Sequence, residues 1–391
     1  MDIKDINQKD INQKEKYLDE SWYENFVTSQ TEADAFPFAI WVKILRNLMQ
    51  NRQKDVMMPS PTQGIIELRK AIADELVKTR GLVVSPEQIV VGSSSEYLYS
   101  VISRLIGSEK IYALEDPGYA NIGEVYELNH IKKEYIPVDQ MGMRVEKLTN
   151  SEANVAIVSP SHQFPTGAVM SLERRYDLLE WVKEEKNRYI IEDDYDNEFL
   201  ADEKKIPSLK SLDMNDRTIY MNTFSRTLSS TIRFGYIVLP PQLMDEFHAM
   251  YSFMHCTVSN FEQYTLATFL KEGHFDKQVE RLKLYFEEKQ QLFLRCFEEQ
   301  NLSDYVKLLE YDAGLQFLVE VKDVSSDVDF VKICRKEGIH IKALSSFYHK
   351  PPLESKHLFL IKYSGVSEHR VKEAISRISK ILLEKECEKI G

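Results

Sequence analysis

A polar loop between two apolar runs most constrains the fold of this chain. The run Thr218–Met221 reads as a β-strand, and the run Gly235–Leu239 reads as a second one. The stretch 222–234 between them is rich in hydroxyl groups and carries two arginines, Arg226 and Arg233. Hydroxyl and guanidinium groups donate charge-assisted hydrogen bonds, which a buried phosphate requires. The residues alone leave two interpretations open, a phosphate-binding loop or a polar loop with solvated arginines.

Length and charge limit the class of protein. At 391 residues the chain is long enough for two lobes, because single cores stop growing near ~250–300 residues. The net charge of −12 argues against nonspecific binding to nucleic acid, which requires a basic surface. No apolar run approaches the ~20 residues of a membrane span, and the N-terminus is not signal-like. We therefore expect a cytoplasmic protein with no membrane or nucleic-acid partner.

The cysteines do not form a pattern. All four are scattered and none belongs to a C-x-x-C pair: Cys256, Cys296, Cys334 and Cys387. This predicts reduced thiols and no metal site.

A serine-rich turn follows another strand-like run. The strand pattern Gln88–Val91 leads into Gly92-Ser93-Ser94-Ser95, and a helical pattern starts at Glu96. A strand, a small polar turn and a helix form the geometry of an anion site, because the free N–H groups of the first helical turn face the ligand. Simple capping of the helix by a serine is the alternative.

Two further strand-like runs end in distinctive loops. The run Ile111–Leu114 is followed by Glu115-Asp116-Pro117-Gly118-Tyr119, a turn that presents Tyr119 either to the core or to a ligand. The run Val155–Val158 is followed by Ser159-Pro160-Ser161-His162-Gln163-Phe164-Pro165-Thr166-Gly167, in which prolines favour a rigid loop. His162 by itself indicates a hydrogen-bonded structural histidine.

An acidic cluster ends a fourth run. The strand pattern Tyr189–Ile191 delivers Glu192, Asp193 and Asp194 at its carboxyl end, where open α/β sheets bind ligands. No histidine or glycine-rich calcium loop accompanies them, which argues against a metal site. A solvated cluster is the alternative.

These strings, in this order, resemble the fold type I pyridoxal-phosphate enzymes. They are most similar to the aminotransferase domain of the MocR/GabR-type regulators, whose runs read roughly T-F-S-K-T-L-x-P-x-L-R-L-G-Y, E-D-P-G-Y and S-H-Q-F-P-T-G. The match extends from about Phe36 to the end of the chain. The resemblance implies a class I/II aminotransferase with an aspartate-aminotransferase-like α/β fold, which is a doubly wound, mostly parallel sheet with a smaller α+β C-terminal domain. It also implies a homodimer with active sites at the interface.

The expected organisation follows from the same comparison. We expect a mobile tail at 1–16, an N-terminal segment of the small domain at 17–60, a large cofactor-binding domain at 61–300 and a small C-terminal domain at 301–391. The helical patterns 243–272 and 275–299 predict two long connecting helices. The winged-helix domain that usually precedes this fold in MocR/GabR proteins is not in this sequence, so we expect no DNA binding by this chain.

The resemblance implies pyridoxal 5'-phosphate as the cofactor and assigns roles to residues by motif position. Asp193 corresponds to the partner of the pyridinium nitrogen, Tyr195 to the partner of the ring's phenolic oxygen, and Tyr119 to the residue stacked on the ring. The implied phosphate site consists of Ser94, Ser95, Glu96, Thr223, Ser225 and Arg233.

Two departures from the family fall on its chemistry. Arg226 occupies the position of the Schiff-base lysine. Lysine supplies a neutral amine when neighbours lower its pKa of ~10.4, whereas arginine stays protonated with a pKa above ~12. We therefore predict a cofactor held without a bond to lysine, and impaired transamination. Leu360 stands where the aminotransferases carry the arginine that grips the substrate carboxylate, and Lys362 could substitute only as a point charge.

Three hypotheses for function follow. The chain could be an aminotransferase-family catalyst that acts on an amino acid or amine by a lysine-independent route, with His162 as the candidate base nearest in sequence. It could be a non-catalytic sensor of pyridoxal phosphate or of an amino-acid adduct. It could also be an ordinary aminotransferase that carries an engineered lysine-to-arginine change at Arg226.

Overall fold

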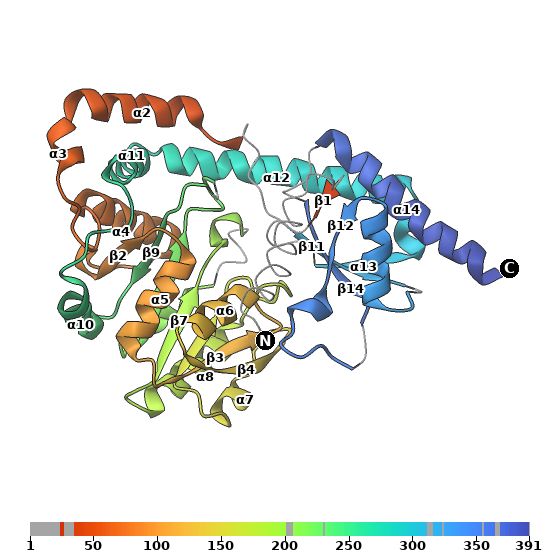
Figure 1. Cartoon of the computed structure of the whole chain (residues 1–391), viewed down its shortest axis with the longest axis horizontal. Coiled ribbons are helices and arrows are strands. Elements are labelled where there is room, and N and C mark those ends of the chain that lie inside the picture. Colours follow the sequence, from red (N-terminus) through yellow and green to blue (C-terminus); the bar gives the residue numbers. More distant parts are fainter. Residues whose placement is uncertain are drawn as a thin grey trace, which may run out of the picture.

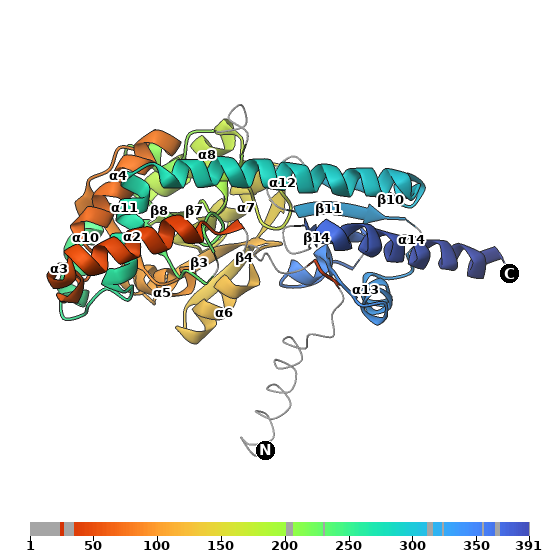
Figure 2. The same cartoon turned by 90° about the horizontal axis from the view of Figure 1, so that it is seen from above.

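The protein consists of two lobes joined by a long helix. The computed structural model describes residues 24–26, 35–200, 206–229, 231–310, 316–322, 324–353, 356–363 and 368–390. The expected mobile tail at 1–16 lies outside the described residues. Helix α12 (His274–Glu299) runs from the large lobe into the small lobe (Figure 1 and Figure 2). Its first turn buries Phe275 in the large lobe, and its second half buries Phe293 in the small lobe.

An eight-stranded sheet forms the centre of the large lobe, with the order β2-β9-β8-β7-β6-β3-β4-β5. Neighbours from β8 to β4 are parallel, whereas β9 is antiparallel to β8 and β2, and β5 is antiparallel to β4. The strands are β2 (Ile89–Gly92), β3 (Ile111–Asp116), β4 (Lys132–Asp139), β5 (Gly142–Met143), β6 (Val155–Val158), β7 (Tyr189–Asp193), β8 (Thr218–Thr223) and β9 (Gly235–Val238). The predicted mostly parallel α/β sheet is confirmed, and the sequence patterns did not predict β4 and β5.

Helices cover both faces of this sheet. One face packs against α5 (Ser95–Ile106), α6 (Ala120–Leu128) and α10 (Pro241–Tyr251). The other face packs against α4 (Ile66–Arg80), α7 (Val145–Thr149), α8 (Leu172–Glu184), α9 (Leu209–Leu212) and α11 (Asn260–Lys271). Such double coverage explains why the strand patterns are continuously apolar.

Local signals explain where key helices begin and end. The Ser94 hydroxyl accepts a hydrogen bond from the Tyr97 N–H and caps α5. Helix α4 ends at Gly81, whose φ of +60° lies in the left-handed region that glycine adopts readily. Gly92 and Gly235 are paired across β2 and β9, and a Cβ at either position would come within 3 Å of Leu98 on α5. These small residues let α5 approach the edge of the sheet.

The expected single helix over 243–272 is wrong. The structure has two helices there, α10 and α11, separated by residues 252–259. The Ser259 hydroxyl accepts a hydrogen bond from the Phe261 N–H, so α11 has its own capped start. Because the sequence has a helical pattern on both sides of residues 252–259, the pattern did not indicate the break between the two helices.

The small lobe is a four-stranded antiparallel sheet with the order β10-β11-β14-β13. Its elements are β10 (Val306–Glu310), β11 (Gln316–Val321), α13 (Asp327–Lys336), β12 (Ile339–His340), β13 (Lys342–Ala343), β14 (Leu358–Lys362) and α14 (Glu368–Ile390). A 3-10 helix, Leu344–Phe347, follows β13. No helix in the described ranges is long and apolar enough to cross a lipid bilayer.

The N-terminal segment divides between the lobes. Strand β1 (Glu24–Asn25) pairs in parallel with β12 of the small lobe. Helices α2 (Phe38–Asn51) and α3 (Gln53–Met57) instead lie against the large lobe, where Ile44 and Leu48 are buried in the core that α4 and α11 also form. The expected small-domain segment 17–60 therefore contributes to both lobes where it is described.

Candidate functional site

The carboxyl ends of several strands meet at a cavity between the two lobes. The cavity has a volume of about 660 Å³, within the range of about 300–1,000 Å³ typical of ligand pockets. Loops after β3, β6, β7 and β8 and the first turn of α5 form its large-lobe wall. Residues of β14 and of the segment after β13 form the opposite wall.

Nine of the ten residues that the sequence singled out line this cavity: Ser95, Glu96, Tyr119, Asp193, Tyr195, Thr223, Ser225, Arg226 and Arg233. They come from four separate segments of the large lobe. Ser94 does not line the cavity, because its hydroxyl caps α5. The hydroxyl-rich loop and the serine-rich turn are thus brought to one place by the fold.

The loop between β8 and β9 is held by its apolar residues. Phe224, Leu228 and Phe234 are all nearly inaccessible to solvent and pack into the core beside α4 and α11. Thr223 and Gly235 pair at the base of the loop. With the apolar side chains anchored, the polar residues of the loop are left to face the cavity.

The pleat of β7 selects one carboxylate of the acidic cluster for the cavity. Asp193 lies there and accepts a hydrogen bond of 2.6 Å from the Tyr99 hydroxyl on α5. Burial raises the pKa of Asp193 to about 7, and the neighbouring Asp194 and Asp196 also raise it, whereas the Tyr99 hydrogen bond opposes the shift. Asp193 thus titrates near neutral pH, and no cation of the described residues lies within ion-pairing distance of it.

The adjacent carboxylates turn away from the cavity, as the alternation of a strand requires. Glu192 accepts hydrogen bonds of 2.9 Å from the N–H groups of Leu209 and Lys210 at the start of α9. Asp194 forms an ion pair with Arg80, 2.9 Å between Oδ2 and Nε, and accepts a hydrogen bond from the Tyr220 hydroxyl.

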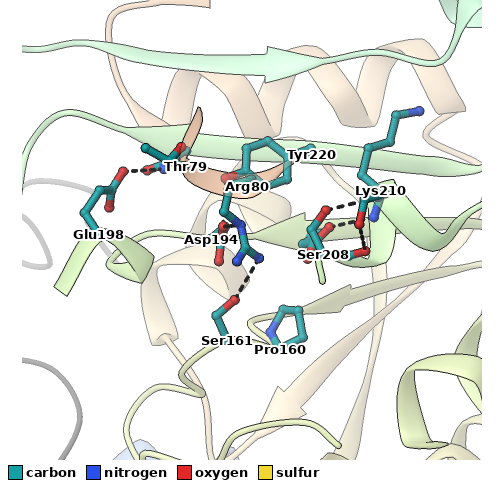
Figure 3. Close-up of polar contacts among 12 residues, drawn as sticks. Thr79, Arg80, Pro160, Ser161, Asp194, Glu198, Ser208, Lys210 and Tyr220 are labelled. Atoms are coloured by element: carbon teal, nitrogen blue, oxygen red, sulfur yellow. Dashed lines mark hydrogen bonds and ion pairs between the residues drawn. The ribbon is translucent and has the colours of Figure 1, made fainter. Parts of the chain in front are cut away.

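Figure 3 shows this buried polar cluster, whose labelled residues do not line the cavity. Arg80 comes from the end of α4 and also donates to the hydroxyl of Ser161 at 3.2 Å, in the loop after β6. Tyr220 belongs to β8, and its ring lies above the Arg80 guanidinium group in this view. The cluster connects α4, the loop after β6, the end of β7 and β8, and it contains Asp194, which lies between the two cavity residues Asp193 and Tyr195.

The sequence reasoning did not assign a role to one buried acidic residue of the cavity, Glu115. Glu115, at the end of β3, lines the cavity and receives hydrogen bonds of 3.3 Å from the Ser159 N–H and the Gln163 amide. Burial raises the pKa of Glu115 to about 8, although these two hydrogen bonds act to lower it. Its position at a strand end, in the Glu115–Tyr119 string, was the available signal.

Arg226 faces the cavity beside an aromatic ring. Its guanidinium carbon lies 5.8 Å from the centroid of the Tyr195 ring. Burial holds the pKa of Tyr195 well above its usual value although Arg226 opposes the shift, so the phenol stays protonated. Among the described residues no carboxylate lies within ion-pairing distance of Arg226.

The other arginine of the loop is paired. Nη2 of Arg233 lies 3.1 Å from Oε2 of Glu96, and both side chains are partly exposed. Glu96 belongs to the first turn of α5, where its hydrogen bonds and Arg233 lower its pKa despite partial burial. A phosphate at this place would compete with Glu96 for Arg233.

The small lobe contributes one lysine and an aromatic wall. Lys362, at the end of β14, lines the cavity with its Nζ 4.9 Å from the centroid of the Phe164 ring. Phe347 packs edge-on against Phe164, and the His349 ring stacks on Tyr135 at 4.0 Å. The family resemblance had drawn attention to Lys362, whereas no local sequence signal marked Phe347 or His349, because only the packing of the lobes brings them to the site.

His162 does not line the cavity. It is 1% exposed, and its Nδ1 lies 2.7 Å from Oδ2 of Asp196 and 3.3 Å from the Tyr195 hydroxyl. The residue therefore has the buried, hydrogen-bonded position of a structural histidine beside the site.

The fold and this site define a class of protein, the fold type I aminotransferases. Solved structures with this fold include an archaeal alanine:glyoxylate aminotransferase, with a TM-score of 0.81 at 24% identity over 93% of this chain and 91% of that one. A kynurenine aminotransferase of Pyrococcus horikoshii, in complex with PMP, has a TM-score of 0.81 at 23% identity over 96% and 94% of the two chains.

The chain belongs to the family Aminotransferase class I and II, which matches residues 30–378. Among its relatives is the Uncharacterized HTH-type transcriptional regulator YdeL of Bacillus subtilis (strain 168), 32% identical over 94% of this chain and 78% of the relative. Another is the Probable rhizopine catabolism regulatory protein MocR of Rhizobium meliloti, 30% identical over 90% and 71% of the two chains. The predicted resemblance to MocR-type proteins is confirmed. These relatives give no support to the expectation of no nucleic-acid partner.

Proposed function

We propose that this protein is a pyridoxal-phosphate-binding member of the aminotransferase family that acts on an amino acid or amine, with the cofactor held by noncovalent contacts. The convergence of the nine predicted residues on one cavity carries the proposal. An arginine at position 226 cannot supply the neutral amine of a covalent link.

The residues present suit a phosphorylated pyridine. Arg233, Thr223, Ser225 and the start of α5 at Ser95 offer donors for a phosphate. Tyr119, which is 43% exposed and packs edge-on against Phe164, offers a face for a ring.

The remaining polar groups suit the ring itself. Asp193 is a buried carboxylate with no ion-paired cation among the described residues, and a protonated ring nitrogen would supply one. The Tyr195 hydroxyl is a donor for the phenolic oxygen. When bound, pyridoxal phosphate supplies a ring that accepts electrons from an attached amino acid. Asp193 would hold the proton on the nitrogen during that process.

Titration with pyridoxal phosphate tests the proposal. We expect saturable binding, followed by quenching of protein fluorescence, with no link to lysine after borohydride reduction. Asp193→Ala should weaken binding by at least tenfold, because it leaves the ring nitrogen without its partner. Equal affinity in the wild type and in Asp193→Ala, or no saturable binding, would contradict the proposal.

A non-catalytic sensor is the second candidate function. Arg226 favours it, because arginine is a very poor proton acceptor, and the relatives named as regulators also favour it. Single-turnover assays with a panel of amino acids separate the two. Conversion of bound cofactor to its amine form indicates a catalyst, and binding without conversion indicates a sensor.

A further inference from the structure

Among the described residues that line the cavity, Lys362 is the one lysine, and it comes from the opposite lobe to Arg226. It is partly buried, at the end of β14, and its Nζ is held over the face of Phe164. The family resemblance implies a lysine on the loop after β8 and an arginine on this strand. In this chain the loop carries the arginine and the strand carries the lysine.

The charges around Lys362 are unusual for a lysine. The charged groups that face it are Arg226, from the loop after β8, and Lys342, from β13. Strand β14 also pairs with β11, and there the residue opposite Lys362 is the uncharged Gln316. Within the described part of the chain, no carboxylate lies within ion-pairing distance of Lys362.

Two cations that share a cavity without a counter-ion repel each other, and the repulsion is relieved when the lysine loses its proton. Burial, Arg226 and Lys342 together lower the pKa of the Lys362 amine to about 7. Desolvation next to a second cation is a recognised way to activate a lysine as a nucleophile.

We propose that Lys362 is a carbonyl-reactive amine that forms a reversible imine with an anionic carbonyl compound held in the cavity, beside the guanidinium group of Arg226. The chemical class is the 2-oxo acids; pyridoxal phosphate, which the proposed function holds without a covalent bond, serves as the comparison. The nitrogen lone pair attacks the carbonyl carbon. The carbonyl oxygen then leaves as water with the two amine hydrogens, so that no oxidant or reductant is required. Arg226 is placed to attract the anionic group.

The same cavity holds acids that suit the loss of water. Glu115 keeps its proton up to about pH 8, and Asp193 titrates near 7. Each is therefore able to donate a proton to a leaving hydroxyl group near neutral pH. The proposal does not require pyridoxal phosphate to bind, so it stands or falls separately from the proposed function.

Borohydride trapping tests this inference. The full-length protein is incubated at pH 7 with pyruvate in one arm and with pyridoxal phosphate in the other, reduced, and mapped by peptide mass spectrometry. At an ordinary pKa of ~10.4 only about one amine in 2,500 is neutral at pH 7, whereas Lys362 is about half neutral. We expect labelling of Lys362 to exceed that of the exposed Lys350 by about a hundredfold or more.

Three variants make the test specific. Lys362→Arg keeps the charge but removes the amine, so it should abolish the adduct, and Lys350→Arg should leave it unchanged. Arg226→Gln should raise the pKa of Lys362, so that labelling falls at pH 7 and recovers at pH 9. Far-UV circular dichroism establishes that each variant is folded.

The two arms identify the source of the carbonyl. A pyruvate adduct at Lys362 supports the inference and points to a 2-oxo acid. An adduct with pyridoxal phosphate alone overturns the inference, and it would also contradict the noncovalent mode of cofactor binding proposed above. No adduct at Lys362 in either arm, or labelling no greater than that of Lys350, overturns the inference. Saturable binding measured without borohydride tests the proposed function independently.

Discussion

Replacing Arg80 by methionine removes one partner of a buried ion pair. The side chains of Arg80 and Asp194 are 3% and 0% exposed, and their charged atoms lie 2.9 Å apart. Burial acts to lower the pKa of Arg80, but Asp194 and the more weakly acting Tyr220, Glu192 and Glu198 together outweigh it and raise that pKa, so the guanidinium group stays charged. The variant leaves Asp194 with the Tyr220 hydroxyl, 2.7 Å away, as its hydrogen-bond donor.

The expected cost follows from the burial of the pair. Removing one partner of a buried ion pair costs about 3–5 kcal/mol, because the other charge remains desolvated. The Tyr220 hydrogen bond offsets about 1 kcal/mol of this cost. We therefore expect Arg80→Met to lower the free energy of unfolding by about 3 kcal/mol. The double variant Arg80→Met/Asp194→Asn should cost less than the sum of the single changes, with a coupling on the order of 2 kcal/mol.

Urea unfolding followed by far-UV circular dichroism measures these free energies. The matched control is Arg144→Met, because Arg144 pairs with Glu146 at the surface, where the side chains are 40% and 53% exposed. An exposed pair of this kind is worth about 0–1 kcal/mol. If Arg80→Met cost no more than Arg144→Met, the buried pair would not stabilise the fold and the reasoning would be refuted.

Four further predictions concern the cavity and the assembly. Arg226→Lys should produce a visible absorbance band with pyridoxal phosphate that borohydride abolishes, and a colourless variant would mean that more than one residue prevents the link. Glu96→Gln should tighten pyridoxal-phosphate binding about five- to tenfold in a fluorescence titration, because it frees Arg233 and removes a like charge from the phosphate site; unchanged affinity would contradict this. The folded-state pKa of Glu115, about 8, lies above its unfolded value of ~4.3, so ionisation costs stability as pH rises through this window. Glu115→Gln should therefore raise stability by roughly 1–3 kcal/mol at pH 8.5 and little at pH 4, and an equal effect at both pH values would exclude this cause. The homodimer that the family resemblance implies should appear in light scattering as twice the chain mass, and the mass of a single chain would contradict it.

The sequence alone determined the strands that carry the site and the residue types at their ends. Continuous apolar runs such as Val155–Val158 and Tyr189–Ile191 identified buried strands, because a strand covered on both faces excludes polar side chains. Gly81 marked the end of α4, and the serine-rich turn marked the start of α5. Local backbone preferences and capping decide these features within a few residues, so the sequence contains them.

Tertiary structure decided which side chains face one another. Successive side chains of a β-strand point to opposite faces of the sheet, so Asp193 and its neighbours on β7 face opposite ways. The packing of α5 on one of these faces decides that Asp193 is the residue that lines the cavity and accepts a hydrogen bond from Tyr99. Lys362 lies 136 positions after Arg226 in the chain and acquires its lowered pKa only because the lobes bury both cations in one cavity. Burial and the approach of charges across lobes depend on distances between segments remote in sequence, and no local pattern encodes those distances.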